Sequence, residues 1–316
     1  MKHGKRIKGV LAPVVTPFNA DLSPDPARFV NHCRWLLQQN SGLAVFGTNS
    51  EANSLSVNER MALLDALAAA GLDTSRMMPG TGCCALTDSV RLTEQAVKLG
   101  CAGVLMLPPF YYKGVTDEGL YRNYSEVIQR VGDARLRIYL YHIPPVAVVG
   151  ISLKLVERLL KAYPSAIAGM KDSSGDWNNT KTFLDAYAKS GFDIFPGSES
   201  FLLAGLRNGG AGCISATANV NPAAIHKLYG EWQSNTADDQ QKALNAVRDA
   251  FSKKYVMIPA LKQAIAHFAD DPQWAMVRPP LDPLTKAQAA AFIPELRQIG
   301  FTMPGLKEMH AHRAAA

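Results

Sequence analysis

A single lysine, Lys171, stands where the apolar run Ile167–Met170 gives way to a polar sequence that starts with Asp172. In a protein of alternating strands and helices, such a point is the carboxyl end of a strand, where active sites form. A lysine there can bind an anion as a point charge, or attack a carbonyl carbon as a neutral amine. A third interpretation, in which Lys171 only pairs with Asp172 or Asp176, gives it no chemical role.

Other polar side chains follow the ends of other short apolar runs. Tyr141 ends one such run, and Thr48 and Asn49 follow Gly42–Gly47. A phenol both donates and accepts hydrogen bonds, so Tyr141 can move the protons when an amine adds to a ketone. Lys171 would then form an iminium ion, which draws electrons from a neighbouring C–C bond. The apolar layer expected beneath Lys171 favours this chemistry, because burial disfavours a charged amine.

The same strand ends offer little for other chemistry. His142 follows Tyr141 directly, so strand alternation turns its side chain to the opposite face, and we expect a structural role. No cluster of Asp and Glu accompanies it at the strand ends, so the sequence predicts no metal site. A Gly-x-Ser-x-Gly elbow is also absent. These residues therefore favour Schiff-base catalysis with neither a metal nor another cofactor.

Eight short apolar segments, each followed by a segment with helical spacing, would position these residues. Ser56 and Glu59, for example, form a capping box at the start of one helix. The strands are expected over residues 10–15, 42–47, 76–80, 102–107, 136–141, 167–170, 192–195 and 212–215. This pattern predicts an α/β protein with a (β/α)8 TIM barrel. A doubly wound sheet is the alternative, but the turn Pro13–Pro17 lacks the glycines such a sheet usually has there.

The pattern changes after about residue 234. Residues 236–269 and 285–298 are rich in Ala, Lys and Gln and have helical spacing, with no convincing strand between them. We therefore expect a catalytic barrel domain over residues 1–234 and a small C-terminal helical domain over residues 235–316. One helix is expected to be capped by Thr87 or Asp88.

The composition of the chain indicates which partners and which cellular location to expect. The net charge is +6, but no stripe of Lys and Arg alternates with aromatic residues, so nucleic acid is not an expected partner. No apolar run reaches 18 residues, so we expect no membrane span and a cytoplasmic location. The five cysteines lie among apolar or small residues without a Cys-x-x-Cys pair, which predicts buried free thiols.

Three motifs follow one another at the expected strand ends. They are Gly47-Thr-x-x-Glu51, Tyr141-x-Ile-Pro144 and Gly169-x-Lys171-Asp-Ser-Ser-Gly175. Together they resemble the dihydrodipicolinate synthase / N-acetylneuraminate lyase family of class I, Schiff-base aldolases. The resemblance covers nearly the whole chain, including the helical C-terminal part.

The resemblance implies roles for individual residues. Lys171 would form the Schiff base with pyruvate or another 2-oxo acid, and Tyr141 would be the catalytic phenol. Thr48 would link Tyr141 to a tyrosine of a neighbouring subunit, for which Tyr112 is the best match and Tyr111 the alternative. The family further implies a homo-oligomer, commonly a homotetramer built as a dimer of dimers. The residues expected to bind substrate are Thr48, Asn49, Ser173, Gly197 and Ile214.

Two departures from the family pattern bear on the substrate. Asn49 replaces a hydroxyl residue that helps to bind the substrate carboxylate. Val146 stands where dihydrodipicolinate synthases have an arginine that binds the carboxylate of aspartate semialdehyde, and valine cannot form that bidentate contact. We therefore expect a metal-free Schiff-base lyase, an aldolase or dehydratase, with pyruvate as substrate or product.

Three other functions remain open. One is 4-hydroxy-tetrahydrodipicolinate (dihydrodipicolinate) synthase, which condenses pyruvate with aspartate semialdehyde. The second is a non-catalytic barrel that binds a small acid. The third is a barrel enzyme that binds phosphate through Gly197–Ser198 and Gly209–Gly210.

Overall fold

The structure is a computed structural model that describes residues 6–311. It divides into two compact units, and each is described by itself below. Unit 1 holds the residues up to Gly9 together with Asp73–Ile214. Unit 2 holds Val10–Leu72 together with the residues from Ser215 onward. The domain boundary expected near residue 234 is a different division of the chain and stays a prediction.

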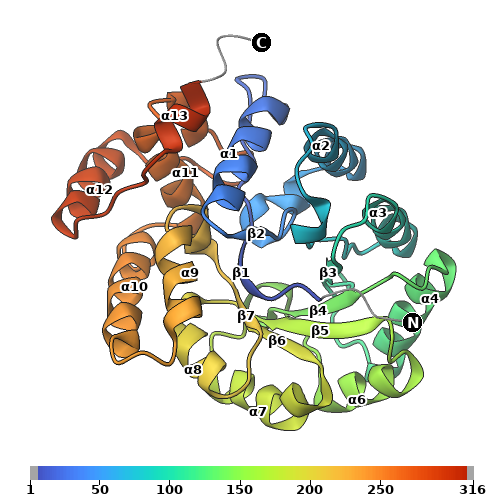
Figure 1. The fold of residues 1–316 in the computed structure, drawn as a ribbon. Helices are drawn as coiled ribbons and strands as arrows, with labels where there is room; N and C mark the ends of the chain where they lie inside the picture. Colours follow the sequence, from blue (N-terminus) through green and yellow to red (C-terminus); the bar gives the residue numbers. More distant parts are fainter. Residues whose placement is uncertain (1–5, 312–316) are drawn as a thin grey trace. The chain divides into compact units, whose positions relative to one another are not determined.

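A parallel four-stranded sheet lies at the centre of unit 1 (Figure 1), and its strand order is β3-β4-β5-β6. The strands are Val104–Met106 (β3), Ile138–His142 (β4), Ile167–Asp172 (β5) and Asp193–Pro196 (β6). Every residue of the four strands is buried. Strands covered on both faces read as nearly continuous apolar runs, which is why the sequence reveals them. Gly212–Ile214 (β7) is the last strand of the unit.

Helices connect these strands and lie outside the sheet (Figure 1). The α-helices of unit 1 are Leu86–Lys98 (α3), Asp117–Val131 (α4), Pro144–Ala147 (α5), Leu153–Ala162 (α6), Trp177–Tyr187 (α7) and Leu202–Arg207 (α8). Short 3-10 helices are Thr74–Arg76 (η3), Ala188–Ser190 (η4) and Glu199–Phe201 (η5). The cap expected at Thr87 or Asp88 is wrong, because α3 begins at Leu86 with Ala85 as its N-cap.

The third expected strand, over residues 76–80, is not a regular strand in the structure. Arg76 ends a 3-10 helix, and Gly80 forms only an isolated parallel bridge with Leu105. The carbonyl of Pro79 accepts a hydrogen bond from Leu105 N–H at 2.9 Å, but proline has no N–H to donate. The segment therefore runs beside β3 with an interrupted ladder. Residues 6–311 hold seven assigned strands, one fewer than expected.

Unit 2 combines two parallel strands with the remaining helices. Gly9–Ala12 (β1) passes from unit 1 into unit 2, where Leu11 pairs with Gly42 of β2 (Gly42–Leu43). The α-helices are Pro26–Gln38 (α1), Val57–Ala69 (α2), Pro222–Glu231 (α9), Ala237–Ser252 (α10), Met257–Phe268 (α11), Lys286–Gln298 (α12) and Leu306–Ala311 (α13). The 3-10 helices are Thr48–Ser50 (η1), Ala52–Ser54 (η2), Ala216–Asn219 (η6) and Pro272–Ala275 (η7). The capping box of Ser56 and Glu59 at the start of α2 is confirmed.

The C-terminal part is helical, as predicted, but its first segment is divided. The chain over residues 236–269 forms α10 and α11 separately, and Pro259 lies in the first turn of α11, where a missing N–H is harmless. Aromatic rings join these helices, since the ring centroids of Phe251 and Phe292 lie 5.2 Å apart. α12 begins with a second capping box, formed by Thr285 and Gln288.

Two further predictions concern the membrane and the thiols. Across residues 6–311, no helix combines the length and the apolar character that a bilayer crossing requires. All five cysteines are free, and Cys33 and Cys213 are buried as expected. The prediction of a buried thiol is wrong for Cys84, which is exposed because it lies in the bend before α3 rather than in a strand.

Candidate active site

Strands β4 and β5 bring Tyr141 and Lys171 side by side in unit 1. The two residues are register partners in a parallel pair, so their side chains leave the same face of the sheet. Lys171 Nζ lies 3.2 Å from Tyr141 Oη and 4.3 Å from the centroid of its ring. Each residue is only 2% exposed. The phenol is therefore close enough to exchange a proton with the amine nitrogen.

The neighbouring carboxylates have other partners. Asp172 accepts hydrogen bonds from the backbone N–H of Ser174 at 3.0 Å and from the hydroxyl of Thr180. Asp176 caps α7 instead of approaching the lysine. Within residues 6–311, Lys171 makes no ion pair. The interpretation in which Lys171 only pairs with Asp172 or Asp176 therefore does not hold.

The layer beneath Lys171 is built from a glycine and aromatic rings. A Cβ on Gly169 would lie 2.2 Å from the carbonyl oxygen of Asp193, so glycine permits this close approach of β5 to β6. Phe195 is the register partner of Lys171 on β6, and its ring packs edge-on against Tyr139 with centroids 5.8 Å apart. Burial raises the pKa of the Tyr139 phenol, which keeps it protonated. The apolar layer expected beneath the lysine is present.

His142 lies on the opposite face of β4. Its Nδ1 accepts a hydrogen bond from Ile151 N–H at 2.9 Å, and its ring lies 6.0 Å from that of Phe183 on α7. Burial lowers the pKa of His142, and the Asp172 carboxylate opposes that change. The predicted position of His142, away from Tyr141, is confirmed.

Two expected substrate-binding residues, Ser173 and Gly197, meet at the ends of β5 and β6. Gly197 N–H donates a hydrogen bond to the carbonyl of Asp172 at 2.6 Å. A Cβ on Gly197 would lie 2.0 Å from Ser173 Oγ, so the two strand ends can approach this closely only at a glycine. Ile214, the third residue of this group in unit 1, ends β7 and is fully buried.

Tyr111 and Tyr112 occupy the loop after β3 and face solvent. They are 73% and 75% exposed, and their rings pack edge-on with centroids 5.3 Å apart. The next residue, Lys113, ties this loop to α5 by donating to the carbonyl of Ala147 at 3.1 Å. Both candidates for the inter-subunit tyrosine are thus accessible to a partner.

Thr48 and Asn49 belong to unit 2, where they form the 3-10 turn after β2. Both are half-buried, whereas Ser50 beside them is buried. The turn is fixed at this end because Ser50 Oγ accepts from Gly47 N–H at 3.1 Å and Ser50 O accepts from the Thr16 hydroxyl at 2.7 Å. Thr48 belongs to unit 2 and Tyr141 to unit 1, and the approach of Thr48 to Tyr141 stays a prediction.

A buried ion pair behind this turn is missing from the sequence-based set. Lys262 on α11 donates to Glu51 Oε1 at 2.7 Å, and both side chains are 0% exposed. Arg278 N–H donates to Glu51 Oε2 at 2.9 Å. Burial lowers the pKa of Lys262 to about 8, although Glu51 opposes the change. The available signal is that Lys262 is the lone lysine of the apolar segment Met257–Phe268.

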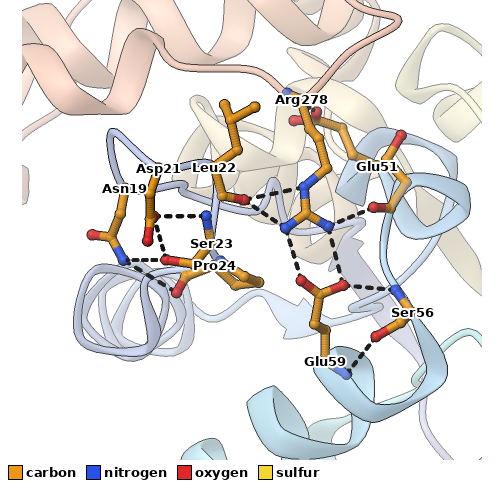
Figure 2. A network of polar contacts seen from close by, with 10 residues as sticks. Asn19, Asp21, Leu22, Ser23, Pro24, Glu51, Ser56, Glu59 and Arg278 are labelled. Carbon is orange, nitrogen blue, oxygen red and sulfur yellow. Dashed lines mark hydrogen bonds and ion pairs between the residues drawn. The ribbon is translucent and has the colours of Figure 1, made fainter.

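Arg278 is the centre of a wider polar network in unit 2 (Figure 2). Its guanidinium donates to the carbonyls of Leu22 and Ser54 and to both carboxylate oxygens of Glu59, at 2.8 and 3.0 Å. Glu59 also accepts from Ser56 N–H at 2.7 Å. The hydrogen bonds from Arg278 are the main reason that the pKa of Glu59 is lowered. One arginine thus joins the turn, the start of α2 and the loop at Leu22.

Metal binding has no candidate cluster in the described part of the chain. Residues 6–311 contain no group of three or more His, Cys, Asp or Glu side chains arranged to hold a metal ion.

Known proteins are similar to this chain in both sequence and fold. The model of the dihydrodipicolinate synthetase family matches residues 6–299. An uncharacterized DapA-like lyase of Chloroflexus aurantiacus is 33% identical over 287 residues, which cover 90% of this chain and 94% of the relative. The 4-hydroxy-tetrahydrodipicolinate synthase of Rhizobium meliloti is 33% identical over 75% of this chain and 78% of that protein.

A crystal structure gives the same result for the fold. Dihydrodipicolinate synthase from Agrobacterium tumefaciens matches with a TM-score of 0.84 at 30% identity, over 93% of this chain and 99% of that one. The predicted fold class is therefore confirmed: an α/β (β/α)8 TIM barrel with a helical C-terminal part.

Proposed function

Because the chain belongs to the dihydrodipicolinate synthetase family, a family of lyases and aldolases, we propose that it is a Schiff-base lyase acting on a 2-oxo acid through Lys171. The observation that carries this proposal is the 3.2 Å contact between Lys171 Nζ and Tyr141 Oη. Both groups are buried at the ends of adjacent strands, above an apolar layer. An amine and a proton-transfer group in contact are what iminium formation requires.

The proposed reaction begins with the neutral amine of Lys171. Its nitrogen forms a bond to C2 of the 2-oxo acid, and Tyr141 returns the proton lost by nitrogen to the former carbonyl oxygen. The resulting hydroxyl takes up a second proton, which Tyr141 passes on from the solvent, and leaves as water, so the product is a protonated iminium ion at C2. The iminium accepts the electron pair when a bond to C3 breaks, which serves aldol cleavage and dehydration alike. Pyruvate is then either the substrate or the product.

The other expected residues take supporting roles in this proposal. Thr48 and Asn49 bind the carboxylate of the 2-oxo acid through the turn after β2. Ser173 and Gly197, which meet at the strand ends, and Ile214 line the site near Lys171. The proposed reaction uses neither a metal nor another cofactor. The cytoplasmic location stays a prediction.

A homo-oligomer completes the proposal, with a tyrosine from one copy reaching the site of another. The large exposed apolar side chains of unit 1 support it, because exposed apolar surface favours association. They include Tyr111, Tyr112, Val146 and Val148, and the two valines are 61% and 63% exposed. Tyr112 is the first choice for the shared tyrosine, and the dimer of dimers is the proposed assembly.

A second candidate function is 4-hydroxy-tetrahydrodipicolinate synthase. The Rhizobium meliloti relative carries that name and favours it. Val146 argues against it, because an exposed valine cannot bind the carboxylate of aspartate semialdehyde as an arginine does. If pyruvate condenses with aspartate semialdehyde at least as fast as with any other aldehyde tested, that result would favour the synthase.

Reductive trapping tests the proposed function. Sodium borohydride with pyruvate should reduce the iminium to a stable adduct, which peptide mass spectrometry should place on Lys171. The variant Lys171→Arg should form no adduct, whereas Lys307→Arg, at a lysine whose side chain is 63% exposed, should react like the wild type. No adduct across a panel of 2-oxo acids, or an adduct on another lysine, would contradict the proposal. A barrel that only binds a small acid would give reversible binding without an adduct.

A further inference from the structure

The buried Lys262–Glu51 pair and Arg278 support the turn that carries Thr48 and Asn49. We propose that Lys262 and Arg278 are positioning residues, which fix this turn so that Thr48 and Asn49 bind the carboxylate of the 2-oxo acid. This inference rests on the proposed function, since that function assigns carboxylate binding to the turn. All five residues belong to unit 2.

The turn ends in a backbone conformation that needs support. Glu51 has a φ of 55°, in the left-handed region. Its N–H donates to Thr48 O at 3.1 Å, and its carbonyl accepts from Ser54 N–H at 2.8 Å, so this conformation joins two successive 3-10 helices. A residue with a Cβ is disfavoured there and persists only where the surroundings hold it. The side chain of Glu51 supplies that hold.

Both carboxylate oxygens of Glu51 are bound. Lys262 donates a hydrogen bond to Oε1 at 2.7 Å, and the backbone N–H of Arg278 donates one to Oε2 at 2.9 Å. The ring of Phe18 lies beneath the two cations, 4.5 Å from Lys262 Nζ and 4.8 Å from Arg278 Cζ. The charged groups that face Lys262 are thus Glu51 and Arg278, and Glu59 neutralises Arg278. Rotation of Glu51 would break both contacts at once.

Stability alone gives a weak reason for this arrangement. Burying two charges costs desolvation free energy, and buried pairs can often be replaced by apolar residues without loss. Burial disfavours the charged form of Lys262 more than Glu51 favours it, as the direction of its pKa shift indicates. What the pair does provide is a fixed position for Glu51, and hence for the turn.

Only a small part of the turn is accessible to a ligand. Within the turn, Gly47, Ser50 and Glu51 are buried, and only Thr48 and Asn49 are half-exposed. Hydrogen bonds fix Ser50 at one end and the pair fixes Glu51 at the other. The backbone that carries Thr48 and Asn49 is thus fixed at this end before a ligand arrives, which lowers the entropy cost of binding.

The test compares two double variants that change charge in the same way. Glu51→Gln with Lys262→Met removes the buried pair. Asp270→Asn with Lys307→Met removes the exposed pair Asp270–Lys307, whose Asp270 also has a φ of 55°. The measured quantities are the pyruvate concentration that gives half-maximal borohydride trapping and the trapping rate at saturation, with thermal unfolding as the check that each variant is folded.

Removing the buried pair should raise the half-saturating pyruvate concentration about tenfold or more, because charge-assisted hydrogen bonds to the carboxylate lose their geometry. The saturated protein should still be labelled on Lys171, and the exposed-pair variant should behave as the wild type does. If the pair only stabilised the fold, its removal would not raise the half-saturating pyruvate concentration while leaving the labelling of Lys171 at saturation intact.

An unchanged half-saturating concentration overturns the inference while trapping itself still supports the proposed function. A wild-type protein that traps no 2-oxo acid overturns the proposed function instead, and the inference with it. If the buried-pair variant does not fold, Glu51→Gln with Lys262→Gln replaces it, since the two amides can hydrogen-bond to each other and the oxygen at position 51 still accepts from Arg278 N–H. That variant should raise the half-saturating concentration about threefold or more, and no rise would overturn the inference.

Discussion

Replacing Lys262 by Met gives the sharpest prediction for stability. The substitution leaves the carboxylate of Glu51 buried, with Arg278 N–H as its remaining donor among the contacts described. Removing one partner of a buried ion pair typically costs about 3–5 kcal/mol, because the other charge stays desolvated and unpaired. We expect the free energy of unfolding of Lys262→Met to fall by this amount at pH 7.

The second substitution should restore part of that loss. In Glu51→Gln with Lys262→Met no net charge remains buried, and the glutamine oxygen still accepts from Arg278 N–H. The amide NH₂ of the glutamine lacks a partner, which costs about 1–3 kcal/mol. The double variant should therefore be more stable than Lys262→Met alone, although it contains one more substitution.

Urea unfolding with linear extrapolation measures these differences. Protein concentration must be held constant, because association shifts apparent stability. The control is Lys307→Met, which removes one partner of an exposed pair and should change the free energy of unfolding far less. A loss no larger than that of the control for Lys262→Met, or a double variant less stable than the single one, would refute the reasoning.

The same lysine makes stability depend on pH. Burial lowers the pKa of Lys262 from 10.5 to about 8, so between these values the unfolded chain binds more protons than the folded one. Stability from this group therefore rises with pH in this window, by up to about 3 kcal/mol, and is constant below it. The difference in unfolding free energy between wild type and the Glu51→Gln, Lys262→Met variant, measured from pH 7 to 10, isolates the effect. A flat difference would contradict it.

Four further variants test the site and its surroundings. Tyr141→Phe should slow turnover about 10²-fold or more, because the proton relay is lost; a near wild-type rate in steady-state kinetics would exclude that role. Gly169→Ala should lower the free energy of unfolding by about 1–3 kcal/mol or more, since its Cβ would lie 2.2 Å from Asp193 O. Gly230→Ala, with open space around it in α9, should instead raise it by about 0.5–1 kcal/mol in the same urea assay. Burial lowers the pKa of His32 well below its ordinary value, so stability should be lost as pH falls below 6.5. His32→Phe should weaken that loss in thermal unfolding between pH 7 and 5, and an unchanged slope would contradict it.

The pair at the centre of the proposed site is within reach of sequence reasoning. Tyr141 and Lys171 end consecutive apolar runs, and consecutive strands of βα units usually lie side by side. Parallel pairing then places both residues at one edge, and alternation sends His142 to the other face. The structure has this arrangement, with Tyr141 and Lys171 as register partners. Here local pattern suffices because order, direction and period determine the neighbours.

Hydrogen bonding limits what apolar patterning can predict. The segment 76–80 has the expected hydrophobicity, but Pro79 cannot donate to a ladder, and the segment forms isolated bridges, at Met77 and Gly80, instead of a strand. Residues 236–269 keep helical spacing throughout, yet α10 ends at Ser252 and α11 begins at Met257. In both cases the apolar period continues across a proline that lacks the N–H which a continuous ladder or helix needs, Pro79 in the first segment and Pro259 in the second. Patterning therefore finds the segment and misjudges its regularity.

The contact between Lys262 and Glu51 shows a stronger limit. The two residues are 211 positions apart, and no period or turn signal joins a helix in the C-terminal part to a turn after β2. A lone lysine in the buried face of α11 does imply that some acid must meet it, because an unpaired buried charge is too costly. Sequence alone cannot say which acid, since that depends on how α11 packs. Glu51 becomes the answer only when its left-handed conformation and its full burial are seen together. The residues that we propose for the chemistry can therefore be found at strand ends, whereas the contacts that hold a turn in place depend on tertiary packing.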